Sequence, residues 1–112
     1  MTNKLEQDQL NKVSGGTGQY NEYYAAASTI FNTYAGFSGE FIGNSDNSNV
    51  CNKLYAALDY LKAGNYKSAI DPLRKAAGSM SSLKYQFPDK ATQLDNCASS
   101  ISDLITKLNN LW

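Results

Sequence analysis

Residues 91–112 read ATQLDNCASSISDLITKLNNLW, and their spacing is the strongest structural signal in the chain. Apolar side chains recur there at every third or fourth position: Ala91, Leu94, Cys97, Ala98, Ile101, Leu104, Ile105, Leu108 and Leu111. This interval places all of them on one face of an α-helix. The segment therefore predicts an amphipathic helix whose apolar stripe packs against the rest of the chain.

Three earlier segments show the same spacing, namely 19–35, 50–63 and 66–85. The second of them ends at Gly64, and the third contains Pro72, which a helix tolerates near its start or as a mild kink. Pro88 separates the third segment from the last. No segment alternates in the way of a β-strand. The sequence therefore predicts an all-α fold, a small four-helix bundle behind a flexible N-terminal leader.

The polar run Asn44–Asn49 is predicted to be a loop between the first two helices, because Asn, Ser and Asp favour turns. Asn47 or Ser48 would then cap the second helix. The run is not typical of a calcium loop, since Asp46 lacks the alternating carboxylates and the terminal glutamate that such a loop uses.

Composition limits the classes of function. The 112 residues suffice for one domain with a modest core. Ten basic and ten acidic residues balance, so the chain has no electrostatic footprint for nucleic acid or for an anionic membrane surface. Histidine, the usual general base, is absent, and the carboxylates are scattered along the chain. We therefore expect no catalytic residue, no metal, no cofactor and no nucleic-acid partner.

The two cysteines, Cys51 and Cys97, are too far apart in sequence for a CxxC redox pair or a zinc site. In an oxidising exterior such a pair is typical of one disulfide, whereas in the cytosol it would be two buried thiols. With short loops the second and fourth helices run parallel, and both cysteines reach a similar height along the bundle. A Cys51–Cys97 bridge can form if those helices touch, and it is the preferred prediction.

The first sixteen residues form a pattern of their own. Leu5, Leu10 and Val13 share roughly one face of a short helix, which the glycines Gly15 and Gly16 end. Glycines lack a Cβ and can pass through a narrow catalytic slot. No apolar run is long enough to span a membrane or to form the centre of a Sec signal, so any secretion would have to use this segment.

This pattern resembles the double-glycine leader of peptides that are secreted by peptidase-containing ABC transporters. In that family the cysteine-peptidase domain of the transporter grips the apolar residues of the leader and cuts after the second glycine. The resemblance implies a cleavage site formed by Gly15, Gly16 and Thr17, with Leu5, Leu10 and Val13 as the residues that the peptidase recognises. It divides the chain into a leader, 1–16, and a helical cargo domain, 17–112. The precursor would be cytoplasmic, and the processed product would be a secreted bacteriocin-like or signalling polypeptide.

A second, shorter resemblance covers residues 58–76, which are similar to one helical hairpin of a tetratricopeptide repeat. The small residues Gly64, Ala69 and Ala76 and the aromatic Tyr66 fall where that family packs its two helices. An array needs several repeats to bury its faces, and the sequence contains no second copy. An ordinary αα-hairpin is therefore the preferred interpretation.

Aromatic residues near the two ends are candidates for contact with a partner: Tyr20, Tyr23, Tyr24 and Trp112. Tyr and Trp favour positions with one apolar and one wet side, although packing on a core face would also explain them. Two functions remain open at this level. One is the secreted cargo of a transporter, and the other is a cytosolic helical adaptor or immunity-type binding protein whose Gly-Gly is incidental. The mass of the extracellular product distinguishes them.

Overall fold

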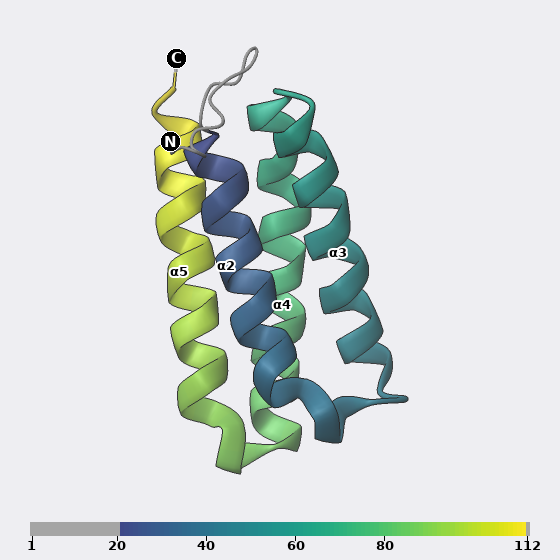
Figure 1. The fold of residues 1–112 in the computed structure, drawn as a ribbon. Coiled ribbons are helices and arrows are strands. Elements are labelled where there is room, and N and C mark those ends of the chain that lie inside the picture. The colour runs from purple at the N-terminus through teal and green to yellow at the C-terminus, as the bar shows by residue number, and fades with distance from the viewer. Residues whose placement is uncertain (1–20, 112) are drawn as a thin grey trace, which may run out of the picture.

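A computed structural model describes residues 21–111 of the chain, and over this range the protein is a bundle of four α-helices (Figure 1). The helices are α2 (Glu22–Phe37), α3 (Ser45–Lys62), α4 (Ile70–Gln86) and α5 (Ala91–Asn109). Short 3-10 turns join them: η1 (Ser38–Phe41), η2 (Tyr66–Ala69) and η3 (Pro88–Lys90). The described residues contain no strand, so the prediction of an all-α four-helix bundle is confirmed.

Consecutive helices run antiparallel, and each helix packs on two neighbours (Figure 1). The neighbouring pairs are α2 with α3, α3 with α4, α4 with α5 and α5 with α2, so that the four axes form a closed square. The two diagonals of the square are α3 with α5 and α2 with α4. Helices on one diagonal run parallel and face each other across the core.

The core consists of the apolar stripes of all four helices. Its largest fully buried side chains are Tyr34, Phe41, Val50, Leu54, Leu61, Leu73, Met80, Leu83, Leu94, Ile101 and Leu108. In α5 the buried residues Leu94, Cys97, Ile101, Leu104 and Leu108 lie on the stripe that the sequence predicts. Full burial of one such aliphatic side chain stabilises the fold by about 1.5–3 kcal/mol. The apolar spacing is therefore the main source of the bundle's stability.

Asn21 joins the start of α2 to the end of α3. Its side-chain Oδ1 accepts a hydrogen bond from the backbone N–H of Tyr24 at 3.0 Å and so caps the helix. Its Nδ2 donates to the backbone carbonyl of Leu61 at 2.9 Å, on the last turn of α3. One side chain thus satisfies orphan groups at the ends of two helices.

The predicted loop over the polar run Asn44–Asn49 is wrong. Helix α3 already begins at Ser45, and Asn44 caps it by accepting from the N–H of Asp46 at 2.8 Å. Gln86 at the end of α4 donates to Asp46 at 2.7 Å and accepts from Asn44 at 2.8 Å. Asn is a preferred cap and Asp is favourable in a first helical turn, and these tertiary contacts select this start among several polar candidates.

Helices α3 and α4 form the antiparallel hairpin that the sequence predicts. Gly64 ends α3 with a φ of 83°, a left-handed conformation that favours glycine. Pro72 lies in the first turn of α4, where its missing N–H costs no helical hydrogen bond. The small residues Ala69 and Ala76 are completely buried in the packed hairpin.

Candidate functional site

The residues predicted for leader recognition and cleavage lie outside the described range. They are Leu5, Leu10, Val13, Gly15, Gly16 and Thr17. The same holds for the aromatic candidates Tyr20 and Trp112. Their roles therefore stay predictions, and the structure bears on the part of the chain that follows the predicted cut.

The predicted disulfide is corrected, because Cys51 and Cys97 are free thiols in the structure. Cys51 belongs to α3 and Cys97 to α5, which are diagonal rather than neighbouring helices. Neighbouring helix axes stand about 8–10 Å apart, and helices on a diagonal are farther apart than that, which disfavours the Cα separation of at most about 7 Å that a disulfide needs. The prediction required these helices to touch, and the square arrangement separates them.

The two thiols belong instead to a polar cluster inside the bundle, which we call the Tyr34 cluster and which comprises Tyr34, Asn47, Cys51 and Cys97. The Tyr34 side chain is fully buried, and its hydroxyl donates to Oδ1 of Asn47 at 2.6 Å. The same oxygen accepts a weak hydrogen bond from Sγ of Cys51 at 3.9 Å. Asn47 therefore links α2 to α3 through one shared acceptor.

The electrostatics of the Tyr34 cluster favour protonated groups. Burial raises the pKa of Tyr34, and the neighbouring thiols of Cys51 and Cys97 and the carboxylate of Asp46 raise it further. Burial also raises the pKa of both thiols. A thiol attacks as its thiolate, so these cysteines are poor nucleophiles. The cluster is a hydrogen-bonded part of the core, and its weakly nucleophilic thiols do not suggest a catalytic site.

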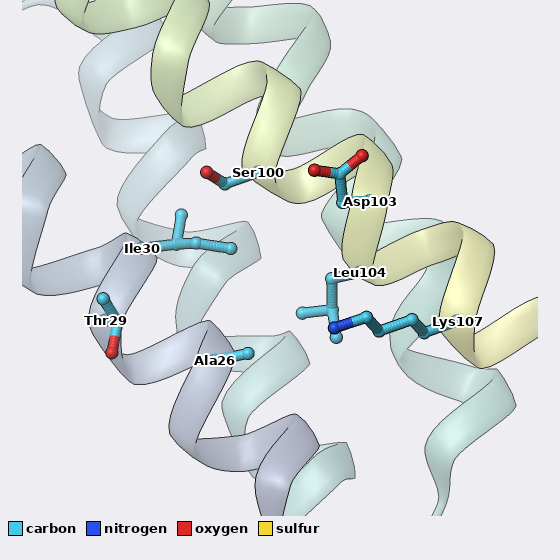
Figure 2. Close-up of a pocket in the computed structure, with 7 residues that line it drawn as sticks. All are labelled: Ala26, Thr29, Ile30, Ser100, Asp103, Leu104 and Lys107. Carbon is cyan, nitrogen blue, oxygen red and sulfur yellow. The ribbon is translucent and has the colours of Figure 1, made fainter.

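A groove along the seam of α2 and α5 is the hollow shown in Figure 2. It has a volume of about 290 Å³ and is lined by Ala26, Thr29, Ile30, Ser100, Asp103, Leu104 and Lys107. Ala26 and Ile30 of α2 face Leu104 of α5, and the long side chain of Lys107 extends beside Leu104 at the mouth (Figure 2). The floor is thus apolar, and the rim carries one acidic and one basic side chain.

The groove continues along the bundle as a narrower hollow of about 90 Å³. The two parts share Thr29, Ile30 and Ser100, and the second part adds Thr33, Asn96 and Cys97. A lining of small, hydroxyl and apolar side chains offers shape and hydrogen bonds rather than a pair of groups for acid–base chemistry. Sequence reasoning missed this groove, although Ala26, Thr29 and Thr33 already marked a stripe of short side chains at helical spacing.

Two of the tyrosines predicted for recognition, Tyr23 and Tyr24, pack against other residues of the bundle. Tyr23 and Tyr24 are half-buried against the core, and the ring of Tyr23 packs on that of Tyr66 with centroids 5.2 Å apart. The exposed aromatic rings of the described residues are others: Tyr55 at 55%, Tyr60 at 41% and Tyr85 at 81%. Core packing therefore accounts for Tyr23 and Tyr24, as the alternative interpretation held.

Two further features are absent from the described residues. No group of three or more His, Cys, Asp or Glu side chains within 21–111 is arranged to hold a metal ion. Over the same range, no helix combines the length and the apolar character that crossing a membrane requires.

Comparison with known proteins returned no match, whether to a family model, to a curated protein or to a solved structure.

Proposed function

We propose that the chain is the precursor of a secreted bacteriocin-like or signalling polypeptide, and that a peptidase-containing ABC transporter cuts it between Gly16 and Thr17. The transporter would then export residues 17–112. The observation that carries this proposal is where the motif lies relative to the fold. The Gly15–Gly16 pair comes shortly before Asn21, the cap of the first described helix.

The buried core supports this division of the chain. Its side chains run from Ala27 to Leu108, and all four described helices lie on the product side of the predicted cut. Cleavage after Gly16 would therefore leave the bundle with every one of these helices. A leader that is removed must not supply the only cover of the product's core, and this arrangement meets that requirement.

The bundle makes pore formation the less favoured use of the product. Its apolar residues are turned into the core, so insertion into a bilayer would require the bundle to open. The balanced charge provides no attraction to anionic lipid. A folded protein that binds a target outside the cell, for signalling or for inhibition, agrees better with this surface.

The groove between α2 and α5 favours one alternative. A concave surface with an apolar floor and a polar rim would equally suit a cytosolic helical adaptor or an immunity-type binding protein. In that case Gly15 and Gly16 would be incidental. The two functions differ in the form and the place in which the chain accumulates.

Cleavage by the cognate peptidase domain, followed by intact-mass analysis, tests the proposal. We expect a product that begins at Thr17. Gly15→Val or Gly16→Val should block the cut, because a branched side chain does not fit a slot built for glycine. Leu10→Ala or Val13→Ala should mainly weaken binding of the leader, and so raise KM more than they lower kcat.

Gly39→Val is the matched control, since Gly39 lies in η1 and a Cβ there would meet no atom within 4 Å. This variant should be cut at the wild-type rate. Cleavage of all four leader variants at that same rate would refute the leader, and so would an intact chain found only inside the cell.

A further inference from the structure

The outer seam between α3 and α4 carries a polar hollow of about 460 Å³, on a different helix pair from the groove of Figure 2. We call it the lysine groove. Its lining residues are Asn49, Lys53, Lys75, Gly78, Ser79 and Ser82. These residues supply two ammonium groups, one amide and two hydroxyls, and none of them is a carboxylate.

Helix geometry brings these side chains together. In α4 the lining residues follow the spacing of one helix face, from Lys75 through Gly78 to Ser82, and in α3 Asn49 and Lys53 are one turn apart. The helices are antiparallel, and Lys53 and Lys75 are equally far along the chain from the turn at Gly64. The two ammonium groups therefore lie at the same end of the groove.

Gly78 keeps the middle of the groove open. A Cβ built on this glycine would meet no atom within 4 Å, so the space above it is free. Glycine inside a helix costs about 1 kcal/mol relative to alanine. Helix α4 thus has Gly78, a residue unfavourable for helix stability, at the position where a larger side chain would enter the hollow.

The polar side chains of the lysine groove are largely without partners. Within the described chain, no hydrogen bond or ion pair engages the side chains of Asn49, Lys53, Ser79 or Ser82. Lys75 is paired with Asp71 at 3.2 Å, at an exposed position where such a pair is weak. By contrast, the polar side chains at the start of α3 are bonded to Gln86.

We propose that the lysine groove binds a phosphate group. The two ammonium groups at one end would attract the phosphate, with Lys75 exchanging its exposed pairing with Asp71 for the ligand, and the hydroxyls and the amide would donate hydrogen bonds to the remaining oxygens. A hollow of this size accommodates a phosphate together with the part of a ligand that bears it. Lysine binds phosphate as a point charge, so the groove selects for charge and for hydrogen-bond geometry. This proposal does not depend on export or on cleavage of the leader.

Titration of the isotopically labelled full chain with inorganic phosphate, followed by amide NMR, tests the proposal. We expect saturable shifts centred on Lys53, Gly78 and Ser79, with a dissociation constant of about 1 mM at low salt. The double variant Lys53→Gln/Lys75→Gln should weaken binding about tenfold or more. Gly78→Leu should also weaken it by filling the groove while it leaves both charges in place.

The matched control is Lys62→Gln/Lys84→Gln, which removes the same charge from positions outside both grooves and should leave the affinity unchanged. Equal weakening by the two lysine pairs would show only general charge attraction and would overturn the proposal. An absence of saturable shifts with phosphate would overturn it as well.

A second arm identifies the source of the phosphate. Vesicles of phosphatidylglycerol are compared with vesicles of phosphatidylcholine at matched lipid concentration. Retention on phosphatidylglycerol that Lys53→Gln/Lys75→Gln abolishes would assign the phosphate to a lipid headgroup. Phosphate binding in solution without such retention would assign it to a soluble phosphorylated ligand.

Discussion

The two ends of the bundle interior differ in the side chains that they bury. At the end where α3 finishes and α4 starts, the core side chains Leu61, Leu73 and Leu108 are apolar, and the polar contact there is the hydrogen bond from Asn21 to the backbone of Leu61. At the opposite end the Tyr34 cluster places a hydroxyl, an amide and two thiols among the apolar side chains. Figure 1 shows this second end where α2 passes into α3 and α4 passes into α5.

This difference shows what apolar burial and hydrogen bonding each contribute to the fold. Burial of apolar surface stabilises in proportion to area and has no direction, so the leucine side chains alone would tolerate small shifts between helices, and at this end the hydrogen bond from Asn21 to the Leu61 carbonyl holds α2 against α3. A hydrogen bond has a required distance and angle, so the link from Tyr34 to Asn47 fixes the height of α2 against α3. We infer that buried apolar side chains supply most of the stability at both ends, and that the Tyr34 cluster adds a directional link within the core.

Truncation at the leucine end should have the largest effect. Leu73 is completely buried, so Leu73→Ala should lower the free energy of unfolding by about 2–5 kcal/mol through lost burial and the cavity left behind. Urea denaturation followed by circular dichroism measures this change. Ile42→Ala is the control, because Ile42 is 83% exposed and its truncation should cost little. Equal losses in the two variants would contradict the assigned core.

Removal of the hydroxyl at the other end should cost less. Tyr34→Phe keeps the ring but leaves Oδ1 of Asn47 without its strongest donor, which should destabilise the protein by about 1–2 kcal/mol. Asn47→Ala in the same background should then add little, because the two side chains share one interaction. A double-mutant cycle measures this coupling. Strictly additive losses would mean that the hydrogen bond contributes nothing.

Alkaline pH should weaken the Tyr34 cluster. The unfolded thiols ionise near pH 9.0 and the unfolded phenol near 10.0, whereas burial raises the pKa of all three groups in the folded state. The unfolded chain therefore loses protons first, so the stability that these groups contribute is complete below about pH 9 and falls as the pH rises above it. Urea midpoints measured at increasing pH should show this decline. Tyr34→Phe should make it shallower, and a decline as steep in this variant as in the wild type would contradict the role of the buried phenol.

The smallest effect is expected from a reducing agent, which should leave the stability of the protein unchanged. Because Cys51 and Cys97 are free, a reductant should not change the melting temperature. Alkylation of the native protein should be slow at Cys97, which is 3% exposed, and complete after unfolding. Intact mass without prior reduction checks the same point. A mass lower by one pair of hydrogens, together with a melting temperature that falls on reduction, would show a bridge and a different packing of α3 and α5.

Local chemistry made most of the helices predictable. The stripe from Leu94 to Leu108 repeats at helical intervals, Gly64 permits the left-handed end of α3, and Pro72 is restricted to a first turn. Each of these features acts within a few residues of the chain, and a single sequence displays them directly. The start of α3 was missed because several neighbouring polar residues could cap it, and the choice depends on Gln86 of another helix.

The sequence by itself therefore determined that this protein is helical and which faces of its helices are buried. The tertiary structure alone decided which helices are neighbours. Four helices with short loops can lie in a row or close into a square, and the square sets α3 and α5 on a diagonal that separates Cys51 from Cys97. It likewise created the grooves on the α2–α5 and α3–α4 seams. The physical reason is that helical periodicity is a local property, whereas the order of helices around a core follows from packing all of their apolar faces at once.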